Sequence, residues 1–401
     1  MPVGDACNRF LTNRANTSSL YASGWGQLGI MHSTISNRRI TALDGWRGIS
    51  ILCVLLSHLV NFRYGALLHS NPPNIAFVLA TWGVDVFFVI SGFIITRLAI
   101  FEYNANAGFS IRNFYIRRLF RIAPPLYLYI VFLGIVSAAS LIQQDQSGIL
   151  AAAAFTCNFS TSKCGWFLGH TWTLAYEEQF YLAFPFIFYW CGKRFNLIIV
   201  LLFVILLVFP FFRYLLNLSS AWHTVSSFSF PFSFICIGSV IAAHEERFKN
   251  LVLARFSVYI SYGIFVMLFV LLVVDVNFSF APKSAPSYIR VMASNILPIC
   301  FAWMIGSAAF KQTRWTWFLN TPFLQFFGMI SYSLYIWQMV FTAAPNLYPK
   351  KSWLLFAPFM ILVASFSYYA VEQPSIRLGK NLVIALRARH GALAQTAEKN
   401  V

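Results

Sequence analysis

Long apolar stretches recur along this chain between residues 47 and 371. A bilayer core of about 30 Å needs about 20 apolar residues to be crossed by a helix, and each stretch approaches that length. Inside lipid, helices of this kind satisfy their own backbone hydrogen bonds. The sequence therefore predicts an all-α polytopic integral membrane protein with about ten transmembrane helices. The runs are 47–66, 75–96, 122–142, 170–192, 195–216, 227–243, 256–274, 289–310, 322–344 and 353–371.

The composition supports the membrane class. Charged residues make up 10% of the chain and hydrophobic residues 59%, whereas a soluble globular protein carries about 25% charged residues. The formal net charge is +17. In a membrane protein such an excess marks cytoplasmic loops that face anionic lipid, so membrane lipids are expected partners. The basic residues form no long run with interleaved aromatics, and no nucleic-acid partner is predicted.

Basic residues alternate with the apolar runs in a way that predicts orientation. Clusters of Lys and Arg follow zero, two, four, six, eight and ten crossings, and the intervening loops are poorer in them. By the positive-inside rule, both termini are cytoplasmic. We predict a multi-pass protein of the cell (inner or plasma) membrane. Its parts are a mobile polar extension at 1–38, a transmembrane domain at 39–377 and a basic cytoplasmic tail at 378–401.

Arg47 and His58 lie in the first run and are separated by ten uncharged residues. On a helix of about 3.6 residues per turn this spacing is about three turns, so both side chains share one face, about 16 Å apart. An ionisable side chain inside an apolar helix indicates a function by default. The alternative is that His58 is a hydrogen-bonded core histidine.

Two carboxylates are expected at a depth similar to that of His58. Counting about 1.5 Å per residue from the cytoplasmic edge places His58, Asp85 and Glu178 about 16, 18 and 22 Å into the membrane. A charge at that depth costs several kcal/mol unless it is paired or hydrated, so the three side chains should face one another or a wet cavity. The predicted roles are a catalytic base, His58, and orienting or pKa-tuning carboxylates, Asp85 and Glu178. A structural pair such as His58 with Asp85 is the alternative.

Arginines gather at the cytoplasmic foot of the third run, at Arg112, Arg117, Arg118 and Arg121. Arg118 and Arg121 are three residues apart and are neighbours on one helical face. Because guanidinium groups bind phosphates bidentately, these two and Arg47 are candidate ligands of a phosphate group. For each arginine, a positive-inside residue without further function is the alternative.

Cysteine spacing gives a prediction of its own. No Cys-x-x-Cys pair or His/Cys cluster in the sequence has the spacing of metal ligands, so no metal is predicted. Cys157 and Cys164 flank a polar stretch between the third and fourth runs. They can form a disulfide if this loop faces an oxidising compartment, and the sequence leaves open whether they do.

Six segments of the chain resemble motifs of the integral-membrane acyltransferase-3 family and occur in the family's order over about 40–377. The first runs from Leu43 to Arg47 and leads to His58, which is similar to the family's basic residue, ten spacers and histidine. The others are 83–93 (GVDVFFVISGF), 115–124 with a family-like Arg-x-x-Arg, 170–181 (HTWTLAYEEQFY), 330–337 (ISYSLYIW) and 372–374 (EQP).

The resemblance implies an enzyme that moves an acyl group from cytoplasmic acyl-CoA to a hydroxyl of a carbohydrate or glycosylated acceptor. Acetyl-CoA is the default donor. His58 would deprotonate the acceptor or take the acyl group transiently, and the three candidate arginines would hold the CoA phosphates. The candidates for binding the acceptor are Trp172, Glu177 and Tyr181; for the two aromatics, an interfacial belt is the alternative.

Two departures from the family pattern affect these expectations. Gln338 follows Trp337 where many members carry histidine, which puts in doubt any second histidine there. Some members append an SGNH-type hydrolase-like domain, and this chain ends too soon after the tenth run to hold one. We therefore expect it to deliver the acyl group itself or with a separate partner. The alternative function is a proton-coupled transporter or flippase of a glycan-type substrate, since intramembrane His, Asp and Glu also suit proton coupling.

Overall fold

The structure is a computed structural model, and every regular element in its described residues is a helix. The all-α prediction is therefore confirmed for this part of the chain. The predicted extension at 1–38 lies outside the described residues, as do the loops at 66–74, between the first two runs, and at 345–352, between the last two runs. The described residues are 39–64, 75–106, 108–159, 161–215, 221–278, 287–311, 313–342 and 353–399.

Four helices of the described chain are long and apolar enough to cross a membrane. They are α2 (Thr41–Tyr64), α3 (Ile75–Asn106), α4 (Ile111–Ala138) and α11 (Ser257–Phe278). The other predicted runs are helical as well and form α7 (Trp172–Cys191), α8 (Phe195–Leu215), α9 (Ala221–Ala243), α12 (Ser287–Phe310), α14 (Pro322–Thr342) and α15 (Trp353–Ser367). The count of ten crossings and the side of the membrane on which the termini lie stay predictions.

The charged segment 97–121 is more helical than the apolar runs suggest. α3 continues to Asn106, well past the predicted end at 96, and α4 begins at Ile111. Ion pairs neutralise the polar residues of this extension: Arg97 donates to Glu245 of α10 (Glu245–Leu253) at 2.9 Å, and Glu102 accepts from Arg117 and Arg387. The helices therefore pass the end of the apolar sequence without leaving these charges unpaired.

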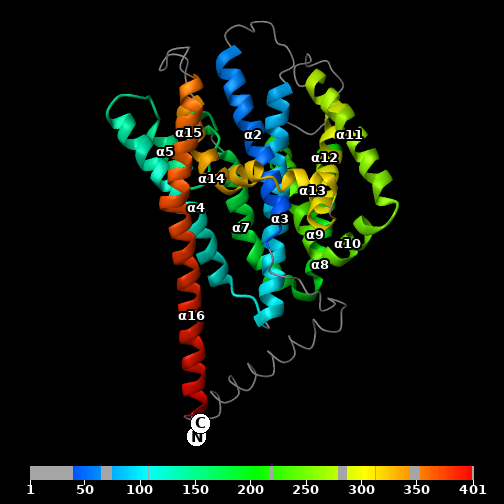
Figure 1. The fold of residues 1–401 in the computed structure, drawn as a ribbon. Helices are drawn as coiled ribbons and strands as arrows, with labels where there is room; N and C mark the ends of the chain where they lie inside the picture. Colours follow the sequence, from blue (N-terminus) through cyan, green and yellow to red (C-terminus); the bar gives the residue numbers. More distant parts are fainter. Residues whose placement is uncertain are drawn as a thin grey trace.

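Two glycines bring α2 and α14 into backbone contact. A Cβ at Gly48 would lie 2.3 Å from the carbonyl oxygen of Leu324, and a Cβ at Gly328 would lie 1.9 Å from that of Asp44. A residue larger than glycine fits at neither position without moving a backbone. α3 packs beside α2 and against α9, so α2, α3, α9 and α14 form a closely packed group within the bundle (Figure 1).

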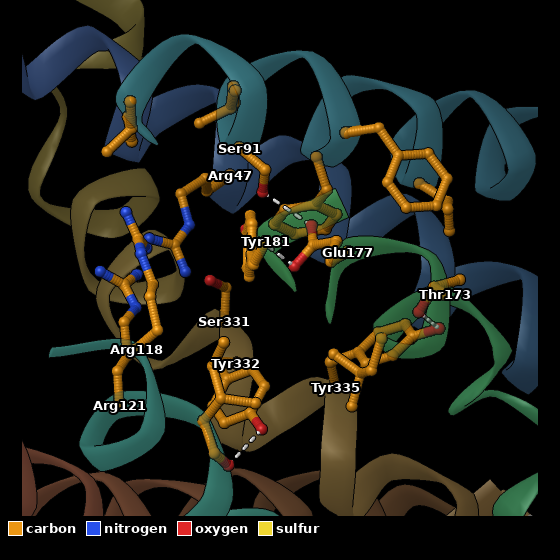
Figure 2. Close-up of a pocket in the computed structure, with 17 residues that line it drawn as sticks. Arg47, Ser91, Arg118, Arg121, Thr173, Glu177, Tyr181, Ser331, Tyr332 and Tyr335 are labelled. Atoms are coloured by element: carbon orange, nitrogen blue, oxygen red, sulfur yellow. Dashed lines mark hydrogen bonds between the residues drawn. The ribbon is translucent and has the colours of Figure 1, made fainter. Parts of the chain in front are cut away.

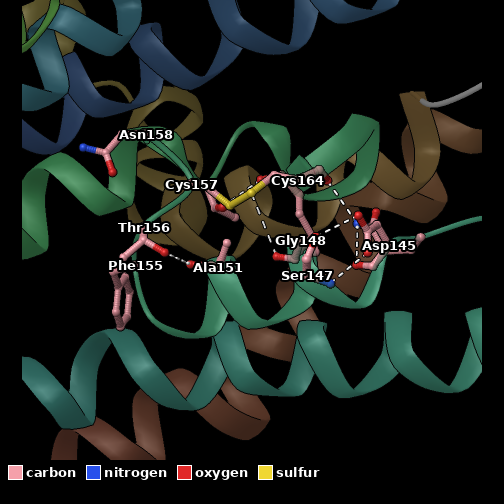
Figure 3. Close-up of a disulfide and its surroundings, with 12 residues drawn as sticks. Asp145, Ser147, Gly148, Ala151, Phe155, Thr156, Cys157, Asn158 and Cys164 are labelled. Carbon is pink, nitrogen blue, oxygen red and sulfur yellow. Dashed lines mark hydrogen bonds between the residues drawn. A yellow bond between two sulfur atoms is a disulfide. The ribbon is translucent and has the colours of Figure 1, made fainter. Parts of the chain in front are cut away.

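The predicted polar loop between α4 and α7 contains two short helices, α5 (Gln146–Ala153) and α6 (Thr161–Gly169). A disulfide joins Cys157 to Cys164, both fully buried, which resolves the question left open by the sequence (Figure 3). Gln179 of α7 exchanges two hydrogen bonds with Asn158, each of 3.1 Å. The Tyr129 hydroxyl of α4 donates to the Phe167 carbonyl at 2.7 Å. This segment is thus part of the packed bundle.

The C-terminal part continues as a helix. α15 is followed by a π-helical turn, Tyr368–Glu372, and by α16 (Gln373–Lys399), which runs in line with α15 and packs against α4 (Figure 1). Glu372 in this turn is 3% exposed and accepts a 2.8 Å hydrogen bond from Ser333 of α14. The residues predicted as a basic tail are therefore helical as far as Lys399.

Candidate active site

Helices α2, α3, α4, α7 and α14 line a partly open cavity (Figure 2). Small-molecule sites typically have a mainly apolar wall with a few polar groups. The apolar wall is Val84, Phe87, Phe88, Ile90, Ile94, Ile122 and Leu174. The polar lining is Arg47, Ser91, Arg118, Arg121, Thr173, Glu177, Tyr181, Ser331, Tyr332 and Tyr335.

Three arginines gather at one end of this cavity (Figure 2). Arg47 comes from α2, and Arg118 and Arg121 come from the same face of α4, as their spacing predicts. The guanidinium carbon of Arg118 lies 5.2 Å from the ring centroid of Tyr181 and 5.9 Å from that of Phe114. Stacking on these rings holds the guanidinium in place and leaves its N–H groups available to another partner.

The ion pairs found among the described residues use four arginines, none of which lines the cavity: Arg39, Arg97, Arg117 and Arg387. None of the three cavity arginines has a carboxylate within 4.0 Å among the described residues. Three half-buried cations without such a partner form a site that favours an anion, because burying a charge is costly unless it is paired.

Glu177 is the acidic group in the lining, and two hydroxyls orient it. Ser91 of α3 donates to one carboxylate oxygen at 2.7 Å, and Tyr181, one helical turn along α7, donates to the other at 3.4 Å (Figure 2). The remaining lone pairs of this carboxylate can accept a hydrogen bond from a ligand.

The end of the cavity away from the arginines is formed by hydroxyl groups. The hydroxyls of Thr173 and Tyr335 lie 2.9 Å apart (Figure 2). Both hydroxyls can donate to the His170 carbonyl, Tyr335 at 2.8 Å and Thr173 at 3.2 Å. These bonds tie α14 to the beginning of α7 and involve no formal charge.

His58 lies beyond this hydroxyl end. Gln338 follows Tyr335 by about one turn of α14, which is about 5 Å along the axis. Its side-chain oxygen lies 3.2 Å from Nδ1 of His58, and Gln338 is fully buried. A second imidazole, that of His170, is 6% exposed, and its ring centroid lies 5.2 Å from that of Tyr335. The nitrogens of the His170 ring have no hydrogen-bond partner among the described residues.

Comparisons with known proteins agree with this geometry. The model of the acyltransferase-3 family, described as an acyltransferase domain, matches residues 40–372. The chain belongs to the acyltransferase-3 family. It is 26% identical over 398 residues to the O-acetyltransferase OatA of Staphylococcus aureus strains NCTC 8325 and COL. These matches cover 90% of this chain and 61% of each relative, so the chain spans less than two thirds of their length. No solved structure matches it.

In this acyltransferase-3 member, five of the residues selected from the sequence meet in one cavity. They are Arg47, Arg118, Arg121, Glu177 and Tyr181. The cavity thus joins the candidate phosphate ligands to part of the candidate acceptor site.

The other candidates lie outside the cavity lining. Asp85 is 2% exposed and Glu178 is half-buried, and each follows a residue that does line the cavity. Neither carboxylate is part of the cavity lining. Trp172 packs edge-on against Phe88, with ring centroids 6.3 Å apart.

The sequence assigned no role to several residues that build the site. Ser91, Tyr332 and Tyr335 all lie in segments that resemble the family, and the two tyrosines are three residues apart, which places them on one helical face. Gln338 was noted only as a departure from the family pattern. Glu372 is buried and interacts electrostatically with Arg121 from behind the cavity wall.

Proposed function

We propose that this protein is a membrane-embedded O-acyltransferase. It moves an acyl group, acetyl by default, from cytoplasmic acyl-CoA to a hydroxyl of a carbohydrate or glycosylated acceptor. The observation that carries the proposal is the cluster of Arg47, Arg118 and Arg121 at one end of an apolar cavity in a member of an acyltransferase family. The relatives named O-acetyltransferase favour an oxygen acceptor and an acetyl group.

The donor would lie along the cavity with its phosphates at the arginines. A hydrogen bond to a charged group contributes about 1.5–3 kcal/mol, and a guanidinium can make two such bonds to one phosphate. The acyl thioester would then extend past Phe87 and Phe88 towards Thr173 and Tyr335. The apolar part of the wall suits the uncharged half of acyl-CoA.

The chemistry needs a base at the far end, and His58 has this role. It takes the proton of the acceptor hydroxyl while that oxygen attacks the thioester carbon. The new C–O bond forms, the C–S bond breaks, and the proton passes from the imidazole to the departing CoA thiolate. A positioned base contributes about 10²–10⁴ in rate. Glu177 and Tyr181 would bind a polar part of the acceptor or donor, and Asp85 and Glu178 stay candidate tuning residues.

The first experiment removes the base and leaves the anion site intact. We expect His58→Ala in lipid vesicles to keep its affinity for acetyl-CoA and to lose about 10²–10⁴ of the transfer rate. The rate is measured as CoA thiol release with a glycan fraction extracted from a deletion strain as acceptor. His244→Ala is the matched control, because His244 lies between α9 and α10, away from the cavity lining.

Two results would overturn the proposal. One is transfer by His58→Ala at a rate near that of the unaltered protein. The other is movement of the glycan across the vesicle membrane without thiol release, which is the behaviour of the transporter alternative. Mass spectrometry of surface glycans from the deletion strain and its parent would identify the acceptor.

A further inference from the structure

His58 and Gln338 meet although 280 residues separate them in the chain. Nδ1 of His58 lies 3.2 Å from the side-chain oxygen of Gln338, and the Gln338 side chain is fully buried. A buried polar atom without a partner is costly, and this contact gives the amide oxygen one. The amide nitrogen has no hydrogen-bond partner among the described residues.

The packing of α2 against α14 fixes the level at which these two side chains meet. The helices run in the same direction and touch through Gly48 and Gly328. His58 and Gln338 each follow their glycine by ten residues, which is about 15 Å along either axis. At the start of the pair, Gln325 of α14 donates to the Thr41 carbonyl of α2 at 2.8 Å. The glycine contact and the Gln325–Thr41 hydrogen bond therefore fix the register of α2 against α14.

The surroundings of Gln338 leave its side chain little freedom. The preceding residue, Trp337, packs against Tyr129 and Phe132, with ring centroids 5.3 and 5.2 Å apart. Thr342 donates to the Gln338 carbonyl at 3.0 Å and is itself fully buried. These contacts hold the Gln338 side chain beside His58, with its oxygen towards Nδ1.

We propose that Gln338 is a positioning residue that holds His58 in the tautomer with its proton on Nδ1. An amide oxygen only accepts hydrogen bonds, so Nδ1 must donate to it. A neutral imidazole has one proton on nitrogen, and the free lone pair then lies on Nε2. Nε2 is thus the atom that takes the proton from the acceptor hydroxyl. This inference rests on the proposed role of His58 as the base, and it adds which nitrogen acts and what selects it.

The tautomer can be observed directly, without an acceptor. We would label the full chain with ¹⁵N-histidine, place it in lipid nanodiscs and record imidazole ¹⁵N spectra, which distinguish protonated from unprotonated nitrogens. His58→Ala identifies the His58 signals among those of the seven histidines. We expect Nδ1 of His58 to be protonated and Nε2 to be unprotonated. In Gln338→Met, which keeps the side-chain length and removes the acceptor, we expect a mixture of both tautomers.

Two spectroscopic outcomes overturn the inference. One is a protonated Nε2 in the unaltered protein, which would mean that the amide nitrogen of Gln338 faces His58. The other is an unchanged tautomer in Gln338→Met. Neither outcome depends on transfer activity, so each is distinct from a failure of the proposed function, which an active His58→Ala would reveal.

Transfer kinetics provide the second test. Loss of one neutral hydrogen bond corresponds to about a 2- to 13-fold change in an equilibrium, so we expect Gln338→Met to lower kcat by about that factor at unchanged KM for acetyl-CoA. Gln338→Glu keeps an acceptor oxygen and should retain the Nδ1–H signal. Met339→Leu is a volume-conserving control at the next residue. In a His58→Ala background, Gln338→Met should cause no further loss; an additional loss there would show that Gln338 does not act through His58.

Discussion

The two ends of the candidate site hold their polar groups in different ways. At one end Arg47, Arg118 and Arg121 present positive charge without a protein carboxylate at ion-pair distance among the described residues. At the other end, neutral hydrogen bonds join His58 to Gln338 and Tyr335 to the His170 carbonyl. The charged end is built to receive a charged partner, whereas the polar groups of the neutral end carry no formal charge. Among the described residues, the ring nitrogens of His170 and the amide nitrogen of Gln338 have no hydrogen-bond partner.

The predicted membrane depth of these residues would account for this division. Charges are least costly near the edge of the bilayer and most costly near its centre, whereas a buried neutral group needs only a hydrogen bond. A ligand with an anionic head and an uncharged reactive group would meet the right environment at each end. The difference therefore points to the direction in which a donor such as acyl-CoA would lie.

The largest expected effect comes from removing the charged end. We expect replacement of both Arg118 and Arg121 by Ala to weaken acetyl-CoA binding by at least about 100-fold, since each lost hydrogen bond to a charged group contributes about 1.5–3 kcal/mol. Titration of the purified protein with acetyl-CoA measures this. Arg112→Ala is the control, because Arg112 is exposed and does not line the cavity. Equal losses in both proteins would mean that the arginines act only through net charge.

A smaller effect is expected from the disulfide-bonded segment, which packs beside the neutral end. The double variant Cys157→Ser/Cys164→Ser should lower the free energy of unfolding by about 2–3 kcal/mol, the chain-entropy value for so short a loop. Denaturant unfolding in detergent measures this, and Cys191→Ser controls for loss of a free thiol. Acetyl-CoA affinity at low temperature should stay the same. A large loss of affinity would contradict the separation of the two ends.

The smallest expected effect tests the register of α2 and α14. Gly328→Ala places a Cβ 1.9 Å from the Asp44 carbonyl oxygen, and overpacking of this kind costs about 1–3 kcal/mol. We expect a lower thermal midpoint and slower transfer, because the contact between His58 and Gln338 depends on the same packing. Gly134→Ala is the matched control, since a Cβ there meets nothing within 4 Å. Equal stability of the two variants would refute the importance of this contact.

The sequence predicts best what depends on near neighbours. The pairs Arg118 with Arg121 and Glu177 with Tyr181 are set by helical spacing alone, and each pair lines the cavity as a unit. The membrane depths that the rise per residue gives stay predictions. Helical spacing did not show which side chains line the cavity, since Asp85 and Glu178 are next to lining residues in the chain and are not part of the lining.

The sequence could not predict how helices that are far apart in the chain align with one another. Gln338 is neutral and has no local partner, and its role becomes visible only when α2 and α14 are placed side by side. The charged segment 97–121 was likewise expected between membrane runs, because the partners of its charges, Glu245 and Arg387, are far away in the chain. Both gaps concern contacts across more than one hundred residues.

The glycine contact between α2 and α14 has a consequence for biogenesis. α2 ends at Tyr64 and α14 begins at Pro322, so more than 250 residues are translated between them. At about 5–20 residues per second this takes on the order of 13–50 s, during which α2 awaits its partner. Under the proposed mechanism, a partly translated chain would hold the arginines of α4 but would lack Gln338, the α14 residue that positions His58. Transfer would then begin only after α14 has been made.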